Sequence, residues 1–282
     1  MVLRVVPAEM SFFSYIPQPP LSAFVEAIWS MTNGSATPSR ERICPDGTMA
    51  LVVHLTDRNL TFFDGGNRQS VRVPLLAGPY SKSFLVDRSE FTAVLGVRFK
   101  PGAGRVFFPV PPYELHNIDV ALGDLDPQEA VRLMDELLSA CTLSAKFRML
   151  ERYLAGKIPS GLLPHPAVEH AIQEFLKVPG VRAIAAVQSE TGFSHTRFNQ
   201  IFREHVGLTP KLFCRIRRFQ SVLRQIESGL PVNWADVAAG CGYFDQAHLI
   251  HDFRAFSGIT PVAYVQQQQS SENHAALASV AG

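Results

Sequence analysis

The segment FREHVGLTPKLF, residues 202–213, recurs with changes as FRAFSGITPVAY, residues 253–264. Phe, Arg, Gly, Thr and Pro occupy the same five places in both copies. A constant offset between the copies indicates one supersecondary unit that is present twice. In each copy a glycine follows a helical stretch, where a C-terminal cap belongs, and Thr-Pro opens the next helix as N-cap and first helical residue. The sequence therefore predicts two similar helical units in its last third.

A tight turn is predicted just before the first helix of each repeated segment. Gly192 and Gly242 stand where such a turn needs a residue that tolerates positive φ, and Ser194 and Asp245 are placed to cap the helices that follow. The order of helix, glycine turn and helix is that of a helix-turn-helix unit. One long helix, predicted within PKLFCRIRRFQSVLRQIES at residues 210–228, joins the two units.

The second helix of each unit has an apolar face and a polar face. Apolar residues such as Phe198, Phe202, Leu249 and Phe253 share one side and are predicted to pack inward. The outward rows are His195, Thr196, Asn199, Gln200 and Arg203 in the first unit, and Gln246, Ala247, Ile250, His251 and Arg254 in the second. Asn and Gln can pair with adenine, Arg with guanine or phosphate, and Ala or Ile with a thymine methyl group, so both faces suit a DNA major groove.

A solvated helix surface is the alternative interpretation of these rows, and for a single isolated helix it would be favoured. The duplication favours DNA, because two units on one connecting helix can place their outward faces about 34 Å, or one DNA turn, apart. The two faces would then enter successive major grooves on one side of the duplex.

The stretches GFSHTRFNQIFREHVGLTPKLF, RIRRFQSVL and VAAGCGYFDQAHLIHDFRAFSGITPVAYV also carry a family resemblance. On them, residues 167–266 resemble the DNA-binding domain of AraC/XylS-type bacterial transcription regulators, which has two helix-turn-helix units on a connecting helix. The resemblance implies base contacts by Thr196, Asn199, Gln200, Gln246, Ala247, Ile250 and His251, which the face analysis also selects.

Arginines supply the candidate phosphate contacts. Arg203 and Arg254 end the outward rows, and the connecting helix adds Arg215, Arg217 and Arg218, which can contact phosphate or form internal ion pairs. Two residues depart from the family pattern: Gln188 stands where a small residue is usual, and His251 stands where arginine is common. Residues 163–268 hold ten Lys and Arg against eight Asp and Glu. We therefore expect weak non-specific affinity, and specific binding that depends on base contacts and on dimerisation.

The N-terminal half has a different pattern. Short β-branched and aromatic runs between turn residues predict a β-rich unit over residues 24–99. Apolar residues at i, i+3 and i+4 spacing in PQEAVRLMDELLSA and TLSAKFRMLERYLAG predict two flanking helices. The stretches PPLSAFVEAIWSM, CPDGTMALVVHL and GVRFKPGAGRVFFPVPPYEL resemble a domain that precedes the DNA-binding module in some regulators of this family. By analogy, that domain senses a ligand, mediates dimerisation, or does both.

Other candidate sites have plainer explanations. Arg98, Lys100 and Arg105 surround KPGAG, which is better read as a strand-to-helix turn than as an anion site, since it lacks the GK[ST] of a P-loop. Trp29 is more typical of a core than of a ligand cavity. The four cysteines are scattered without a CxxC pair, and the histidine pairs have no third ligand in sequence, so neither zinc nor a disulfide framework is indicated.

The sequence thus predicts an α+β protein of two domains. A β-rich regulatory, sensor or dimerisation domain with flanking helices spans 1–156, a proline-containing linker 157–166, an all-α double helix-turn-helix domain 167–268, and a disordered tail 269–282. The prediction is a sequence-specific DNA-binding transcription regulator with no catalytic, cofactor-binding or metal-binding residues. The alternatives are a DNA-targeted enzyme, and a small-molecule-binding protein whose helical domain serves protein contacts.

The expected partners are double-stranded promoter DNA, RNA polymerase, a small-molecule effector and a second copy of the chain. No run approaches the roughly 18 apolar residues of a membrane span, and the first residues lack the apolar stretch of a signal peptide. We therefore expect a cytoplasmic protein with no membrane partner.

Overall fold

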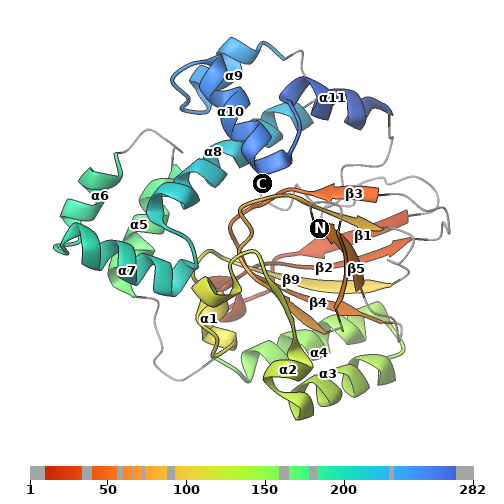
Figure 1. Ribbon diagram of the computed structural model, residues 1–282. Helices are drawn as coiled ribbons and strands as arrows, with labels where there is room; N and C mark the ends of the chain where they lie inside the picture. The colour runs from red at the N-terminus through yellow and green to blue at the C-terminus, as the bar shows by residue number, and fades with distance from the viewer. Residues whose placement is uncertain are drawn as a thin grey trace.

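A computed structural model describes residues 10–33, 40–55, 60–64, 67–71, 74–87, 93–158, 165–177, 183–228 and 232–270. The N-terminal half is β-rich with flanking helices and the C-terminal half is helical, which confirms the predicted fold class (Figure 1). Residues 159–164 of the expected linker and 271–282 of the expected tail lie outside the described residues. Within the described ranges, no helix is long and apolar enough to cross a membrane.

Two antiparallel sheets form the N-terminal half. The larger has the order β1 (Met10–Tyr15), β2 (Val25–Asn33), β9 (Val94–Phe99), β4 (Ala50–His54), β7 (Leu75–Ala77), β10 (Asp119–Ala121). The smaller has the order β3 (Arg40–Ile43), β8 (Phe84–Asp87), β5 (Leu60–Asp64), β6 (Asn67–Val71). Strands β1 and β10 lie outside the range 24–99 that the sequence predicts. Strand β1 pairs with the next strand, β2, whereas β10 has only three residues and pairs with β7, which is distant in sequence.

Both faces of the larger sheet are covered, so successive residues of β2 are buried. Ile28 belongs to the core beneath the helices, whereas Trp29 belongs to a second cluster that includes Val86 of the smaller sheet. This alternation follows from the two-residue period of a strand. Gly96 is paired with Trp29 across β2 and β9, and a Cβ at this glycine would lie 2.0 Å from the indole. Trp29 is therefore a core residue that requires a glycine beside it.

The two predicted flanking helices are α3 (Pro127–Ser139) and α4 (Leu143–Ala155), which Figure 1 shows together at one end of the N-terminal half. Each begins with the expected kind of cap, since Asp126 and Thr142 accept backbone N–H groups. Leu137 and Leu150 are fully buried on their inner faces. The KPGAG stretch is a turn between β9 and the short helix α1 (Gly104–Phe107), as predicted.

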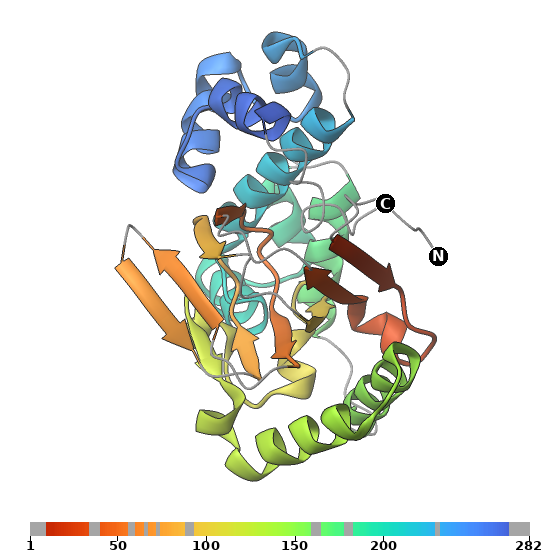
Figure 2. The same ribbon diagram turned by 90° about the vertical axis from the view of Figure 1, so that its right-hand side faces the viewer.

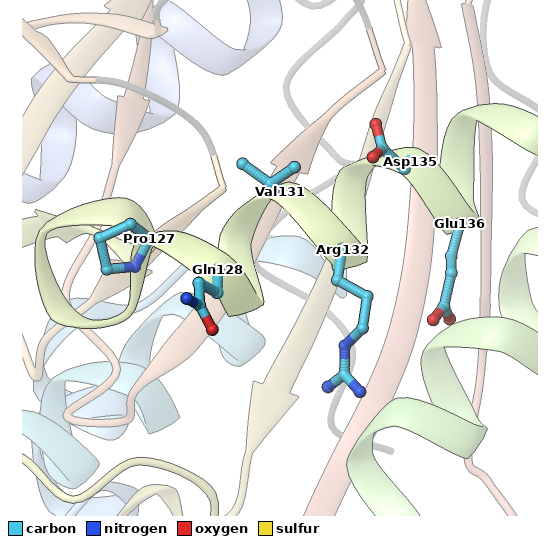
Figure 3. A pocket seen from close by; sticks show the side chains of 6 residues that line it. All are labelled: Pro127, Gln128, Val131, Arg132, Asp135 and Glu136. Carbon is cyan, nitrogen blue, oxygen red and sulfur yellow. The ribbon is translucent and has the colours of Figure 1, made fainter.

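An open hollow of about 550 Å³ runs along the outer side of α3. Figure 3 shows that its lining side chains all come from this one helix: Pro127, Gln128, Val131, Arg132, Asp135 and Glu136. Val131 is 61% exposed there. The hollow is a surface feature of the N-terminal half and lies away from the repeated helical units (Figure 1).

Asp119, at the start of β10, is an acidic residue in an apolar setting. Its Oδ1 is buried and has no hydrogen-bond partner within the described protein. Burial raises the pKa of Asp119 to about 6, and a hydrogen bond from Tyr80 opposes this rise. The ionised carboxylate is therefore destabilising at neutral pH.

We expect Asp119→Asn to stabilise the protein at neutral pH. Between the unfolded pKa of about 3.9 and the folded value, the native state binds more protons, so the free energy of unfolding falls as pH rises through this window and then stays level. An amide does not ionise, so the variant should gain about 1–3 kcal/mol at pH 7.5 and less towards pH 4. Urea unfolding at both pH values measures this, and a pH-independent difference would contradict it.

The C-terminal half consists of α5 (Pro166–Lys177), α6 (Ile184–Glu190), α7 (His195–Val206), α8 (Pro210–Glu227), α9 (Trp234–Gly240), α10 (Gln246–Ser257) and α11 (Pro261–Ser270). The last helix runs to Ser270, so the tail predicted from 269 begins in helix. Helix α8 is the predicted connecting helix, and Figures 1 and 2 show one unit at each of its ends.

The repeated aromatic residues make the same contact in both helical units. In the first unit, the rings of Phe202 and Phe213 meet edge to face with centroids 5.7 Å apart. At the equivalent places of the second unit, the rings of Phe253 and Tyr264 meet edge to face at 5.5 Å. Each recognition helix, as we call α7 and α10, is thus held to the next helix by the same ring pair. Such pairs add stabilisation beyond the apolar area that they bury.

Candidate nucleic-acid interface

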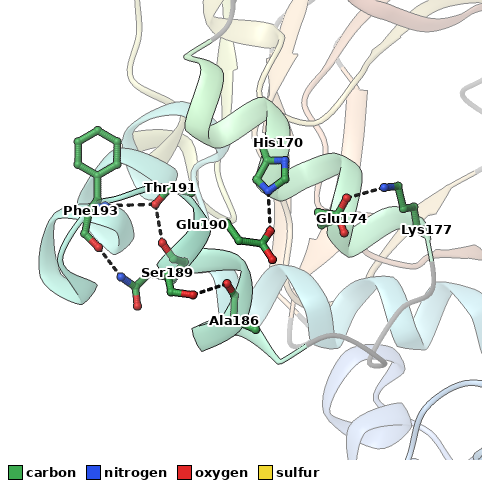
Figure 4. A network of polar contacts seen from close by, with 9 residues as sticks. His170, Glu174, Lys177, Ala186, Ser189, Glu190, Thr191 and Phe193 are labelled. Atoms are coloured by element: carbon green, nitrogen blue, oxygen red, sulfur yellow. Dashed lines mark hydrogen bonds and ion pairs between the residues drawn. The ribbon is translucent and has the colours of Figure 1, made fainter.

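The first helix-turn-helix unit is closed by hydrogen bonds within its own turn. Residues 191–194 join α6 to α7, Gly192 has φ +73°, and Ser194 Oγ accepts the N–H of Arg197 at 3.3 Å. Gln188, which departs from the family pattern, donates its side-chain amide to the carbonyl of Phe193 across the turn. The larger side chain therefore fits, because it satisfies a turn carbonyl. Figure 4 shows Thr191 and Phe193 of this turn. Ser194 and Gly192 have the roles that the sequence predicts.

The second unit uses the same chemistry with a longer turn. Residues 241–245 join α9 to α10, one residue more than in the first unit. Gly242 has φ +76°, and Asp245 Oδ1 accepts the N–H of His248 at 2.7 Å. Both recognition helices end as predicted, since Gly207 and Gly258 adopt left-handed φ values of +87° and +78°.

The structure places most of the predicted outward residues in solvent. The exposed ones are His195, Thr196, Gln200 and Arg203 on α7, and Gln246, Ala247, His251 and Arg254 on α10. Phe198 and Phe202 on α7, and Leu249 and Phe253 on α10, are buried as expected. These residues are exposed in the whole chain, in which the N-terminal half is present. Neither predicted reading surface is therefore covered by it.

Two residues of the rows are half-buried. Ile250 packs partly against the helical core, so only part of its side chain reaches the surface. Asn199 is also intermediate in exposure, and its side-chain amide donates to the carbonyl of His195 at 2.8 Å. Gln200 donates to Glu204 Oε1 at 2.8 Å. These local hydrogen bonds must be exchanged before either amide can contact a base, at a net cost of roughly 1 kcal/mol each.

The arginines of the connecting helix α8 make internal contacts. Arg215 lies 2.7 Å and Arg218 3.7 Å from the carboxylate of Asp252, whose side chain is only 2% exposed. Arg217 is half-buried and donates to the carbonyl of Asp46 in the N-terminal half at 3.5 Å. Burial lowers the pKa of Arg217, and Asp46 and Glu26 oppose this effect. Of the two uses that the sequence left open for these arginines, the structure shows internal pairing.

The N-terminal half contacts the C-terminal end of α7. A Cβ on Gly207 would lie 2.5 Å from the ring of Pro79 and 2.7 Å from the carbonyl of Pro112. Arg203 stacks over the ring of Tyr113 at 5.7 Å. A cation in this position is attracted to the ring face. Arg203, in the outward row of α7, thus contacts the N-terminal half.

The N-terminal half also contacts the C-terminal end of α10 and the middle of α8. Ser83 N–H donates to the carbonyl of Phe256 at 2.8 Å, and Arg42 donates to the carbonyl of Ser257 at 2.7 Å. These carbonyls end a helix, where cationic and N–H donors are favourable. On α8, Gln220 donates to the carbonyl of Pro45 at 2.7 Å. The N-terminal half therefore contacts the C-terminal ends of both recognition helices and the middle of α8.

Sequence reasoning missed Asp252, Arg42, Ser83 and Tyr113. Asp252 could have been found from the sequence, because it lies on the inward side of α10, where a buried carboxylate needs a cationic partner. Arg215 and Arg218, three residues apart on α8, are such cations. The other three had no such signal, because their partners are far away in sequence. For the part of the chain described here, no group of three or more His, Cys, Asp or Glu is placed to hold a metal ion.

Two family models match the chain. Residues 187–267 match a model described as a helix-turn-helix domain, and residues 13–121 match a domain of unknown function, DUF6597. None of the curated proteins compared matches the chain significantly.

Solved structures show weak overall likeness. ToxT from Vibrio cholerae has a TM-score of 0.44 and 10% identity, over 92% of this chain and 98% of that chain. The DNA-binding domain of AdpA in complex with a target DNA has a TM-score of 0.35 and 20% identity, over 37% of this chain and 94% of that chain.

The helix-turn-helix match covers both glycine turns, both recognition helices and the connecting helix. It therefore coincides with the duplicated unit that the caps, the left-handed glycines and the repeated ring pairs define. The chain is a sequence-specific DNA-binding transcription regulator with an AraC-type helix-turn-helix domain, preceded by a DUF6597 domain.

Proposed function

We propose that α7 and α10 enter successive major grooves of a promoter, on one side of the duplex. The base-facing residues are Thr196, Asn199 and Gln200 on α7, and Gln246, Ala247, Ile250 and His251 on α10. Arg203 and Arg254 are placed one or two turns further along the same rows and contact phosphate. One observation supports this best. In both α7 and α10 the inner face is buried, while most of the outward row is exposed, and the two helices lie at opposite ends of α8.

The chemistry of the two rows differs in a way that bears on the operator. The α7 row presents hydroxyl and amide groups, which recognise bases by hydrogen bonds, with Asn and Gln suited to adenine. The α10 row combines one amide with Ala247 and Ile250, which suit thymine methyl groups. The two half-sites should therefore differ in sequence, and the operator should not be a simple repeat of one half-site.

We expect Asn199→Ala and Gln246→Ala each to weaken specific binding by about 1–3 kcal/mol, because each would remove a base contact. DNA fragments selected from random sequence by the purified protein supply the operator, and titration at fixed salt measures the change. Gln225→Ala, an exposed amide at the end of α8, is the matched control and should bind as the parent does. Unchanged binding by both test variants would remove these base contacts from the proposal.

The N-terminal half is proposed to control DNA binding through its contacts with both recognition units. An effector, or pairing with a second copy, would favour one arrangement of these contacts over another, and so shift the population of DNA-competent molecules. Contacts of Arg203 with Tyr113 and of Ser83 with Phe256 support this route, since they reach α7 and α10 respectively. Recruitment of RNA polymerase would follow from the bound position on the promoter.

A further inference from the structure

Phe244 is an unusual residue for its position. It is 93% exposed, more than any other large hydrophobic side chain in the described ranges, where the next values are 63% for Ile16 and 61% for Val131. It lies in the turn of the second unit, directly before the cap residue Asp245 of α10. Exposing a phenylalanine forgoes the free energy that burial of its ring would give. A partner that covers the ring would recover it.

The outward position of Phe244 is fixed by its neighbour. Tyr243 is 5% exposed, its ring stacks beneath the guanidinium of Arg218 at 5.1 Å, and it meets the ring of His248 at 5.1 Å. The backbone N–H of Tyr243 also donates to the carbonyl of Ala238 at 2.9 Å. With Tyr243 anchored in the core, the next side chain must point away from it.

The first unit has no equivalent. Its turn is shorter, and the residue before its cap, Phe193, is half-buried, packs against the helical core and lies 5.8 Å from the ring of His165. Because the second turn has one more residue, it holds two aromatic side chains: Tyr243 packs inward, and Phe244 points outward. The second unit therefore has an exposed aromatic side chain before its recognition helix, where the first unit has a half-buried one.

Phe244 lies beside the row that faces DNA in the proposed function. It stands in the turn, directly before the N-cap Asp245 and two residues before Gln246, where α10 begins. Ala247 lies in that row, and Ile250 lies on the adjoining row and is partly exposed. With Phe244, these two residues give the N-terminal end of α10 an apolar patch, beside the hydrogen-bonding groups of Gln246. Thymine is the base that presents an apolar group, its 5-methyl, in the major groove.

We infer that Phe244, with Ala247 and Ile250, contacts thymine methyl groups in the half-site under α10. This inference rests on the proposed entry of α10 into the major groove. Burial of a methyl group against an aromatic ring gives a preference of about 3–10-fold for thymine over uracil, which lacks only that methyl. Phe244 would then be a specificity-determining residue that the first unit does not possess.

The test is a uracil scan of the operator with the full-length protein. Fragments selected from random DNA define two half-sites, and the half-site whose base preference relaxes in Gln246→Ala is that of α10. Each thymine is then replaced singly by uracil, and affinity is measured for the parent, Phe244→Ala and Leu176→Ala. Leu176 is 36% exposed on α5 and is the matched control for loss of a surface apolar side chain.

The parent should lose affinity about 3–10-fold at one or more thymines of the α10 half-site, and Phe244→Ala should abolish the penalty at one of these positions at least. Leu176→Ala should keep the parent's pattern, and Phe244→Leu should keep part of the penalty. An α10 half-site without thymine, no uracil penalty in the parent, or an unchanged penalty in Phe244→Ala would overturn the inference. Failure to select any fragment would instead overturn the proposed function itself.

Discussion

Asp252→Ala should lower the free energy of unfolding of the helical half by about 3–5 kcal/mol, which is the usual cost of removing one partner from a buried ion pair. The carboxylate of Asp252 is 2% exposed and faces Arg215 at 2.7 Å and Arg218 at 3.7 Å, with His248 at 3.9 Å. Without it, two guanidinium groups would remain close together between α8 and α10 with no counter-charge. The second unit should therefore loosen first.

Tryptophan fluorescence can follow this unit selectively. The chain has two tryptophans, Trp29 in the N-terminal half and Trp234 in α9. In a Trp29→Phe background, urea titration of Trp234 emission reports on the second unit. Asp236→Ala, an exposed acid of α9, is the control and should change the midpoint little. A loss below about 1 kcal/mol for Asp252→Ala would show that the ion pair is not a structural requirement.

Gly207→Ala should also be strongly destabilising, by about 2–5 kcal/mol. Gly207 has φ +87°, and a non-glycine residue there costs about 1–2 kcal/mol. In addition, its Cβ would lie 2.5 Å from Pro79 and 2.7 Å from the backbone of Pro112, so the N-terminal half would have to move away. Overpacking of this kind typically costs a further 1–3 kcal/mol.

Gly192→Ala is a matched control for the backbone effect. Gly192 has φ +73° but no atom within 4 Å of its Cβ position, so its replacement should cost only the about 1–2 kcal/mol of backbone strain. Thermal or urea unfolding of the two variants beside the parent measures the difference. Equal losses would mean that the contact with Pro79 and Pro112 adds nothing to stability. A larger loss for Gly207→Ala would assign the excess to the contact between the halves.

The caps and turns were predictable because they are local. Ser194, Asp245 and Thr209 accept N–H groups three residues ahead, and Gly207 and Gly258 adopt left-handed φ, as residue chemistry and spacing indicated. The inward and outward faces of α7 and α10 followed from helical periodicity in the same way. The repeat itself predicted the domain, because both copies had to satisfy one geometry.

Non-local features could not be predicted. For Arg217 the sequence left open a phosphate contact or an internal pair, and the structure shows that it donates to the carbonyl of Asp46, which is far away in sequence. The strand β10 was missed because it has only three residues and pairs with β7, which is far away in sequence. Phe244 was passed over because the sequence does not show that Tyr243, rather than Phe244, packs inward. Each of these depends on which distant surface a side chain meets.

The stretch from Pro79 to Ser83 bears on the spacing between the two half-sites that the protein can bind. Its proline rests against the last residue of one recognition unit, and its serine holds the carbonyl that closes the other. One short connection thus contacts the ends of both recognition helices, which α8 also joins. A molecule that displaced this connection would change which spacer length the protein accepts, so that promoters differing by about one base pair between half-sites would exchange their order of affinity.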